Sequence, residues 1–265
     1  MKDLQGKTAV VTGGGSGIGR ALALAFAAEG MKVVVGDIET HAANTVADEV
    51  RARGKEALAA WCDVSHLSSV QSLAEQAYER FGAVHVLCNN AGVVALGKPL
   101  AELKEPDWRW TLSVNLDGVA HGIEAFVPRM LAQVGEGHIV NTASIAGLVA
   151  GAGPGIGIYT ASKYGVVGLS ETLRAELAET GIGVSVLCPG GVATRIAEAE
   201  RNRPEEFGGP TRTEPLVGMG NAMDPAVVAE KVVAGIKENR LYILTHPETK
   251  GLVEARFRAI MAAYE

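Results

Sequence analysis

The stretch that most constrains this chain is a glycine-rich turn, Thr12-Gly13-Gly14-Gly15-Ser16-Gly17-Ile18-Gly19. It follows a short apolar run at 8–11, which predicts a buried strand, and it precedes residues 20–28, which are rich in helix formers. The glycines therefore stand at a strand-to-helix turn, where free backbone N–H groups and the helix dipole favour an anion. Because glycine leaves the backbone open to close approach, the turn predicts a pyrophosphate site.

The spacing of these glycines differs from the common G-x-G-x-x-G fingerprint. Gly13, Gly17 and Gly19 form G-x-x-x-G-x-G, and the alternative is a flexible loop that happens to hold five glycines. The next apolar run, 32–36, predicts a second strand that ends at Asp37. Asp37 follows Gly17 by twenty residues, the distance at which an acidic residue meets the adenosine ribose hydroxyls. The strand, the helix and the acid together favour a dinucleotide site.

Strand-like runs alternate with helical patterns along the whole chain. Most of the strands are continuous apolar runs, which are typical of a parallel sheet covered by helices on both faces. The sequence therefore predicts an α/β doubly wound sheet of about seven strands, in a single domain over residues 1–265. Strands are expected at 8–11, 32–36, 57–62, 84–88, 137–141, 184–188 and 241–244. Helices are expected at 20–28, 39–53, 68–80, from 107 into the 120s, and at 159–179, 225–238 and 247–263.

Polar or glycine-containing clusters follow several of these strands directly. The carboxyl ends of parallel strands meet at one edge of a sheet, and ligands bind along that edge. The sequence therefore predicts that these clusters form one site. They are Asp37, Asp63-Val64, Asn89-Asn90-Ala91-Gly92, Ser144 and Pro189-Gly190.

Charge and cysteine content exclude several classes of partner. The net charge of −6 and the absence of a basic run argue against nucleic acid. Cys62, Cys88 and Cys188 are odd in number and lack metal-ligand spacing, which favours buried reduced thiols and a cytoplasmic location. The sequence shows no signal-peptide pattern and no apolar stretch long enough to span a membrane. The six histidines show no ligand spacing, so no metal site is expected.

Taken together, these motifs resemble the short-chain dehydrogenase/reductase family over essentially the whole length. The motifs are Thr12-Gly13-x3-Gly17-Ile18-Gly19, Asp63, Asn89-Asn90-Ala91-Gly92, Asn115, Ser144, Tyr159-x3-Lys163 and Pro189-Gly190-x-Val192-x-Thr194. A single Y-x-x-x-K pair arises often by chance, but the full set in one order does not. The resemblance implies a Rossmann fold, hydride transfer with a nicotinamide cofactor, and a homo-oligomer. That oligomer would be a tetramer or a dimer, with dimers formed through the helices at 107–134 and 159–179.

The candidate catalytic residues also make chemical sense by themselves. Tyr159 and Lys163 are four apart at a helix start, so they share a face. A phenol has a pKa of about 10, and a nearby ammonium or a positively charged nicotinamide lowers that pKa. Such a phenol can exchange a proton with an alcohol or carbonyl, while Ser144 hydrogen-bonds the substrate oxygen. The resemblance adds that Lys163 binds the nicotinamide ribose and that Asn115 holds a water in a proton relay.

Each of these residues also has a simpler interpretation. Ser144 could cap a turn, Tyr159 could pack on the sheet, and Asn115 could be a polar kink in a helix. Asn90-Ala91-Gly92 could form an ordinary turn, whereas the resemblance has it support the sheet and contact the adenosine ribose. The simpler account leaves unexplained why the catalytic candidates all fall at the strand-end edge.

The acidic residue after the second strand favours NAD over NADP. Asp37 accepts hydrogen bonds from ribose hydroxyls and repels a 2′-phosphate, although it could instead cap the next helix. The neighbouring positions, Ile38 and Ser16, are not basic. By resemblance, Asp63 would hydrogen-bond the adenine amino group. The expected cofactor site comprises Gly13, Ser16, Gly17, Ile18, Gly19, Asp37, Ile38, Asp63, Val64, Asn90, Ala91, Gly92, Tyr159, Lys163, Pro189, Gly190, Val192 and Thr194.

The expected substrate pocket is apolar. Its walls are Val93-Val94-Ala95-Leu96, 145–158 and 195–222, with Lys98 as the only nearby fixed charge of the first two. This composition favours a neutral, hydrophobic secondary alcohol or ketone. The 195–222 segment is long for a loop, as substrate lids often are.

Two features of these walls leave the substrate open. Arg195, Arg201, Arg203 and Arg212 in the lid could meet an anion, but a solvated face is the more common arrangement. The loop between Ser144 and Tyr159, with Gly151, Gly153, Gly155 and Gly157, is longer than the usual family spacing, so no substrate is named.

The sequence therefore predicts an NAD-dependent dehydrogenase/reductase of secondary alcohols and ketones. The catalytic set is Asn115, Ser144, Tyr159 and Lys163. Two alternatives stay open. One is a catalytically idle NAD-binding regulator, and the other is an epimerase or dehydratase that recycles the cofactor on the same scaffold.

Overall fold

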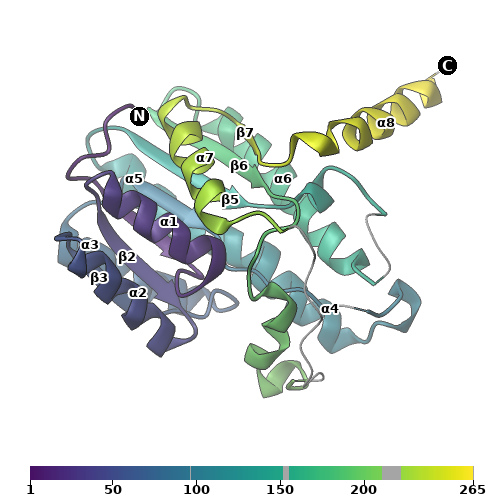
Figure 1. Ribbon diagram of the computed structural model, residues 1–265, viewed down its shortest axis with the longest axis horizontal. Coiled ribbons are helices and arrows are strands. Elements are labelled where there is room, and N and C mark those ends of the chain that lie inside the picture. The colour runs from purple at the N-terminus through teal and green to yellow at the C-terminus, as the bar shows by residue number, and fades with distance from the viewer. Residues whose placement is uncertain (96, 152–154, 211–221, 265) are drawn as a thin grey trace.

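A parallel seven-stranded sheet forms the centre of the computed structural model, which describes residues 1–95, 97–151, 155–210 and 222–264 (Figure 1). The strand order is β3-β2-β1-β4-β5-β6-β7, and every neighbouring pair is parallel. The strands are β1 Thr8–Thr12, β2 Lys32–Asp37, β3 Ala57–Trp61, β4 Val86–Asn89, β5 Gly137–Thr142, β6 Ile182–Cys188 and β7 Tyr242–Leu244. This architecture confirms the predicted doubly wound α/β fold.

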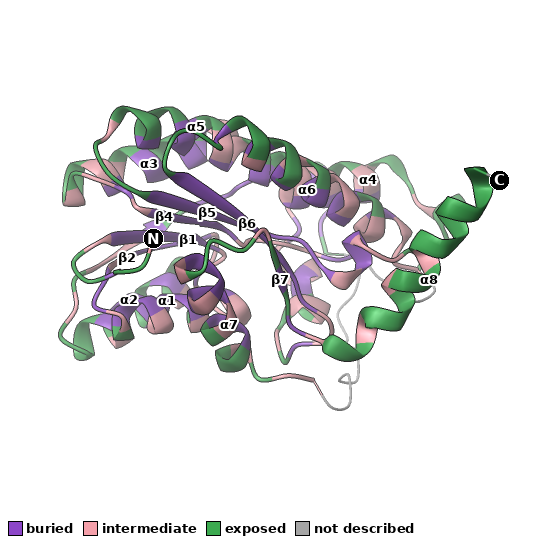
Figure 2. Ribbon diagram, turned by 90° about the horizontal axis from the view of Figure 1, so that it is seen from above, coloured by how far each residue is buried: buried purple, intermediate pink, exposed green. Residues whose placement is uncertain are grey.

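Helices cover both faces of the sheet (Figure 2). On one face, α1 Gly17–Ala28, α2 Thr40–Ala52 and α7 Pro225–Lys237 bury side chains such as Phe26, Val46 and Val232. On the other face lie α3 Leu67–Phe81, α5 Gly118–Ala132 and α6 Gly157–Glu176, with Leu73, Phe126 and Leu173 in their core. Because both faces are covered, the central strands β1, β4 and β6 are buried along their whole length, as their apolar runs predict.

The chain order reverses beside β1. The chain moves from β1 to β2 and β3 on one side, and it then returns to place β4 on the other side of β1. A doubly wound sheet opens a crevice at such a switch point, outside the carboxyl ends of the strands. The glycine-rich turn lies at this point, because it joins the end of β1 to the start of α1.

The long helix expected from residue 107 is interrupted. It consists of α4 Glu105–Leu112, a π-helical turn at Ser113–Asp117 and α5. Asn115 lies inside this wider turn and is fully buried. Other boundaries differ from the predicted ones by a few residues. For example, α1 begins at Gly17 rather than at residue 20, because Ser16 already has the extended backbone of an N-cap.

The last helix stands apart from the body of the protein. α8, Lys250–Met261, contains no buried residue and projects away from the sheet in both views (Figures 1 and 2). Its exposed apolar side chains include Leu252, Phe257 and Met261. Among the described residues, no helix is both long and apolar enough to cross a membrane.

The predicted lid contains two short 3-10 helices, Ile196–Asn202 and Glu205–Phe207. Of the 195–222 span, residues 211–221 lie outside the described part of the chain, and Arg212 is among them. At the far end of the span, Met223 pairs with Val192, so the chain returns beside the end of β6.

Candidate functional site

A cleft of about 1100 Å³ opens at the carboxyl edge of the sheet. The expected catalytic and cofactor-binding residues all line it except Asn115, which is buried. Asn89, expected at the same edge, is also buried, and it donates to Asn141 instead. The structure thus brings together side chains that are far apart in the sequence. The lining set includes Gly13, Ser16, Gly17, Ile18, Gly19, Asp37, Ile38, Asp63, Val64, Asn90, Ala91, Gly92, Ser144, Tyr159, Lys163, Pro189, Gly190, Val192 and Thr194.

The glycine-rich turn is shaped for an anion. Gly13 and Gly17 have φ values of +61° and +51°, which favour glycine. A Cβ on Gly19 would lie 2.0 Å from the carbonyl oxygen of Gly13, so no other residue fits there without a backbone shift. α1 starts without a side-chain cap and without an acidic residue in its first turn. Its first N–H groups therefore remain available to a phosphate.

Asn90 holds the glycine-rich turn in place. Its Nδ2 donates to the carbonyl oxygens of Thr12 at 3.0 Å and Gly13 at 3.3 Å. The hydroxyl of Thr12 in turn accepts from the backbone N–H groups of Asn90 and Ala91, at 3.0 and 3.2 Å. These bonds tie the ends of β1 and β4 together. The predicted supporting role of this stretch therefore has a geometric basis.

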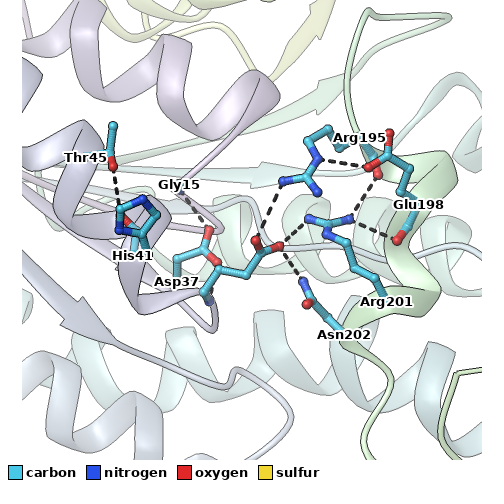
Figure 3. Close-up of polar contacts among 9 residues, drawn as sticks. Gly15, Asp37, His41, Thr45, Arg195, Glu198, Arg201 and Asn202 are labelled. Atoms are coloured by element: carbon cyan, nitrogen blue, oxygen red, sulfur yellow. Dashed lines mark hydrogen bonds and ion pairs between the residues drawn. The ribbon is translucent and has the colours of Figure 1, made fainter.

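Asp37 and Asp63 lie at the ends of β2 and β3. The carboxylate of Asp37 accepts from the N–H of Gly15 at 2.8 Å and from the N–H of Glu39 at 2.9 Å (Figure 3). Burial raises the pKa of Asp37, although these two bonds oppose the change. Asp63 accepts from the N–H and the hydroxyl of Ser65, at 2.9 and 2.7 Å. Both carboxylates are thus fixed in orientation within the cleft.

The loop after β6 is positioned by a histidine that sequence reasoning missed. Nδ1 of His246 accepts from the N–H of Gly190 at 3.0 Å, and Nε2 lies 3.1 Å from the carbonyl oxygen of Gly191. Because Nδ1 accepts a hydrogen bond here, Nε2 is assigned as the nitrogen that carries the proton and donates to Gly191. His246 lies two residues beyond β7, so no local pattern links it to this loop. Further along this loop, Thr194 lies so near Gly17 that a Cβ added to Gly17 would come within 2.9 Å of the Thr194 methyl group.

Ser144, Tyr159 and Lys163 converge in the same cleft. Nζ of Lys163 donates to the carbonyl oxygen of Thr142 at 2.8 Å and lies 5.5 Å from the centre of the Tyr159 ring. The hydroxyl of Ser144 accepts from the N–H of Ala146 at 3.2 Å, so this serine also caps the short helix Ile145–Gly147. The simpler interpretation of Ser144 as a cap therefore holds together with its place in the cleft.

The structure corrects the expected direction of the pKa of Tyr159. We expected the Lys163 ammonium to lower that pKa, but burial raises it, and the hydrogen bond with Ser144 only partly offsets the effect. The physical reason is that burial removes the solvent that would stabilise the phenolate. Burial also lowers the pKa of Lys163 itself, to about 8.

The buried side chain of Asn115 hydrogen-bonds residues on two elements that line the cleft. Its Oδ1 accepts from the N–H of Val93 at 2.8 Å, and its Nδ2 donates to the Val93 carbonyl at 2.9 Å. Nδ2 also lies 3.1 Å from the hydroxyl of Ser162, which donates to the carbonyl oxygen of Tyr159. Asn115 therefore connects the segment after β4 to the first turn of α6.

The other end of the cleft is apolar. Its wall includes side chains from three of the predicted segments and from α4. The predicted wall residue Leu96 and the loop residues 152–154, which include Gly153, lie outside the described residues. Apolar lining residues are Val93, Val94, Trp110, Val114, Ile145, Ile156 and Ala199.

The expectation of a solvated arginine face is wrong for Arg203. This residue is 4% exposed and pairs with Asp107, which also holds Lys98 at 3.2 Å. Lys98 therefore has an ion-pair partner, although it shares that carboxylate with Arg203. Arg201 is partly buried and pairs with Glu39, whereas Arg195 is exposed at the rim of the cleft. Tertiary contacts with Glu39, at the start of α2, and with Asp107 in α4 decide which arginines are buried, and the composition of the segment does not predict these contacts.

Sequence reasoning also missed Glu39 and Trp110, which line the cleft, and it placed Asn202 in a wall segment without giving it a role. Trp110 lies in α4, which the sequence analysis expected only as part of a long helix. Glu39 follows Asp37 by two residues, but nothing local distinguishes it from a surface acid. Within the described residues, no group of three or more His, Cys, Asp or Glu side chains is arranged to hold a metal ion.

Known proteins resemble this chain over most of its length. The model of the family described as short chain dehydrogenase matches residues 7–205. A CLA biosynthesis dehydrogenase/reductase from Lactiplantibacillus plantarum is 34% identical over 98% of this chain and 95% of its own length. A cyclohexanol dehydrogenase from an Acinetobacter species is 41% identical over 73% of this chain and 76% of its own.

A solved structure also resembles this chain over nearly its whole length. A short chain dehydrogenase/reductase from Burkholderia phymatum, crystallised in complex with NAD, superposes with a TM-score of 0.92 at 42% identity. The superposition covers 99% of this chain and 97% of that one.

Proposed function

The chain belongs to the short-chain dehydrogenase family of oxidoreductases, and we propose that it transfers a hydride between NAD and a neutral, apolar secondary alcohol or its ketone. One observation carries this proposal. The Ser144, Tyr159 and Lys163 side chains meet in one cleft whose other end is the glycine-rich turn. A dinucleotide bound along that cleft would join the two ends.

The residues of the cleft fit such a cofactor. The uncapped start of α1 and the close glycine packing suit a pyrophosphate, and Asp37 suits the adenosine ribose. Asp63 would bind the adenine amino group, and Asn90-Ala91-Gly92 would contact the adenosine ribose. Lys163 and the Pro189–Thr194 segment would hold the nicotinamide end. The Burkholderia phymatum protein, a close structural neighbour, binds NAD, which supports the same choice here.

Tyr159 is the proposed proton carrier. The cofactor, when bound, would supply the hydride chemistry at the carbinol or carbonyl carbon, and Tyr159 would handle only the proton. In oxidation the Tyr159 phenolate would take the hydroxyl proton and become the phenol, and in reduction the phenol would give that proton back. The ammonium of Lys163 and a positively charged nicotinamide would favour the phenolate, against the effect of burial. Ser144 donates to the substrate oxygen. The side-chain amide of Asn115 is engaged by Val93 and Ser162, so its relay water would bind the Asn115 backbone.

The apolar end of the cleft supports the substrate class. Trp110, Val114 and Ile145 line it, and Lys98 beside it is paired with Asp107. No free cation in the described part of this wall would bind a carboxylate substrate. A relative named for cyclohexanol, a neutral cyclic secondary alcohol, is consistent with this chemistry.

Other predictions stay proposals. We retain one domain over residues 1–265, a substrate lid within 195–222, and a cytoplasmic enzyme with buried reduced thiols. We also retain a homo-oligomer, dimer or tetramer, formed through the helices at 107–134 and 159–179. Sedimentation velocity of the full chain would test the oligomer, since a monomer at micromolar concentration would contradict it.

The first test is nicotinamide absorbance at 340 nm during incubation with NAD or NADP and a panel of neutral secondary alcohols. Turnover with NAD that is lost in Tyr159→Phe supports the proposal. Turnover with NADP alone would contradict the role given to Asp37. Substrate conversion without net cofactor reduction would favour an epimerase or dehydratase, and NAD binding without any turnover would favour an idle regulator.

A further inference from the structure

The adenosine end of the cleft contains an anion site that the chain itself fills. The carboxylate of Glu39 accepts from Nδ2 of Asn202 at 2.7 Å and from the guanidinium of Arg201 (Figure 3). Nη1 of Arg195 lies 3.6 Å from its second oxygen. Two hydrogen-bond donors and one further cation from a single segment, 195–202, therefore converge on one carboxylate. Guanidinium groups that bind a carboxylate in this way bind a phosphate equally well.

This cluster lies directly beside Asp37. Glu39 is two residues further along the chain, and its N–H donates to the Asp37 carboxylate at 2.9 Å. The charge of Arg201 also reaches Asp37 and lowers its pKa, against the larger effect of burial. Asp37, Glu39, Arg195 and Arg201 all line the same cleft. The two arginines thus stand next to the carboxylate that is proposed to bind the adenosine ribose.

The guanidinium groups of Arg195 and Arg201 have protein partners, but not every N–H group of Arg201 has one. Arg195 also pairs with Glu198 at 3.0 Å. Arg201 donates to the carbonyl oxygen of Glu198 at 3.0 Å, yet its buried Nε has no hydrogen-bond partner among the described residues. Burial would raise the pKa of Glu39, but the bonds from Asn202 and Arg201 and the charge of Arg195 outweigh it. Glu39 is therefore ionised at neutral pH.

The charged side chains around Glu39 carry a net negative charge. Asp37, Glu39 and Glu198 contribute three negative charges, and Arg195 and Arg201 contribute two positive charges, so the local sum is −1. A neutral residue at position 39 makes the sum zero and frees both arginines from that carboxylate. A phosphate next to the ribose would then meet two guanidinium groups rather than an excess carboxylate.

We propose that Glu39 is a second determinant of cofactor choice, because it occupies the two arginines that would otherwise bind a 2′-phosphate. The inference rests on the proposed function, in that it assumes adenosine binding beside Asp37. The arginines come from the segment after β6 and not from the positions next to Asp37 or Gly17, where neither Ile38 nor Ser16 is basic. In this arrangement the ion pairs of Glu39 hold the 195–202 segment in place. They also disfavour NADP, because they occupy the guanidinium groups that its 2′-phosphate would need.

The test compares two probes that differ only by the 2′-phosphate, 5′-AMP and adenosine 2′,5′-bisphosphate. Their dissociation constants are measured by calorimetry on the full chain, without any substrate. We expect Glu39→Gln to shift the ratio of the two constants towards the bisphosphate by about tenfold, or about 1.4 kcal/mol. Gln keeps an oxygen that can accept from Asn202, so the segment keeps a partner. Asp37→Asn combined with Glu39→Gln should shift the ratio further.

Two further variants make the result specific. Adding Arg201→Gln to Glu39→Gln should abolish the gain, since the freed guanidinium is its source. Glu49→Gln removes the same charge from the exposed pair with Arg20 and should leave the ratio unchanged. An unchanged ratio in Glu39→Gln, or a gain that survives Arg201→Gln, overturns the inference while 5′-AMP binding leaves the proposed function standing. Failure of the unmodified protein to bind either probe overturns both.

Discussion

Arg203 and Asp107 form an ion pair inside the protein, with 2.8 Å between Nη1 of the arginine and Oδ1 of the carboxylate. Their side chains are only 2% and 4% exposed. Nε of Arg203 also donates to the carbonyl oxygen of Phe207, and its guanidinium lies 5.2 Å from the centre of the Trp110 ring. The pair therefore joins the segment 196–207 to α4. The first half of the predicted lid is anchored beside the apolar end of the cleft.

Breaking this pair should strongly destabilise the protein. Arg203→Met leaves Asp107 buried with only Lys98 as a cationic partner, and we expect the free energy of unfolding to fall by about 3–5 kcal/mol. The KM for an apolar substrate should rise as well, because Trp110 loses the group that covers it. Urea denaturation and steady-state kinetics measure the two effects. Arg240→Met is the control, since it removes an exposed pair with Glu238 and should cost under about 1 kcal/mol. Equal effects of the two variants would contradict this account.

The same carboxylate should make the protein sensitive to acid. Burial would raise the pKa of Asp107, but hydrogen bonds from Lys104, Arg203 and Lys98 outweigh it, and the pKa is lowered. A lowered carboxyl pKa stabilises the fold above the pKa of the unfolded chain, and this contribution is lost as the pH falls through the folded value. Unfolding free energies measured between neutral and acidic pH should therefore decline more steeply in the unmodified protein than in Asp107→Asn. Parallel profiles would count against the pair.

Lys163 should lower the stability of the fold while being required for turnover. Burial lowers its pKa from 10.5 to about 8, so at neutral pH the folded protein carries a poorly solvated ammonium. Such a difference is worth roughly 3 kcal/mol, and the lost bond to Thr142 offsets about 1 kcal/mol of it. Lys163→Met should therefore raise the unfolding free energy at pH 7 by about 2 kcal/mol and abolish turnover.

The pH dependence of that difference has a definite sign. Between pH 8 and 10.5 the unfolded chain binds the Lys163 proton and the folded protein does not, so the stability of the unmodified protein rises relative to the variant. Denaturation at pH 7, 8 and 10 measures the gap, which should shrink with rising pH. A variant that is less stable than the unmodified protein at pH 7 would refute the prediction.

Ser144 should tune the proton carrier. Its hydrogen bond lowers the pKa of Tyr159, against the raising effect of burial. In Ser144→Ala that pKa rises further, so the rate profile for alcohol oxidation should move to higher pH, and kcat should fall by about 10²–10³. Rate profiles with saturating NAD measure both changes. A serine that acts only as the cap of Ile145–Gly147 would lower stability and leave the position of the profile unchanged.

Gly19 should be required for nucleotide binding. A Cβ at this position would lie 2.0 Å from the Gly13 carbonyl oxygen, and the backbone of the turn would have to move. Gly19→Ala should therefore weaken NAD binding by about tenfold or more, which is about 1.4 kcal/mol. Gly251→Ala is the matched control, because α8 has open space there. Tight NAD binding in Gly19→Ala would show that the turn is not the pyrophosphate site.

Much of the fold was predictable because its signals are local. The apolar runs that became β1, β4 and β6 can only be buried strands, and the polar residues that follow strands must then share one edge. The glycine-rich turn and Asp37 were predicted for the same reason, since each is placed by the strand that precedes it. The long helix expected from residue 107 into the 120s runs from Glu105 to Ala132 with an interruption. The polar kink that the sequence allowed at Asn115 is a π-helical turn, and its form depends on distant bonds with Val93 and Ser162.

The sequence by itself therefore determined the order of strands and helices and which residues reach the carboxyl edge of the sheet, since these depend on periodicity and on chain direction. The tertiary structure decided the charge states and partners inside the cleft. Glu39 meets Arg201 across 162 positions of the chain, and Asp107 meets Arg203 across 96. The raised pKa of Tyr159 likewise follows from burial, which the fold imposes on its side chain. Electrostatic interactions depend on distance and solvent exposure, and neither is encoded in local sequence spacing.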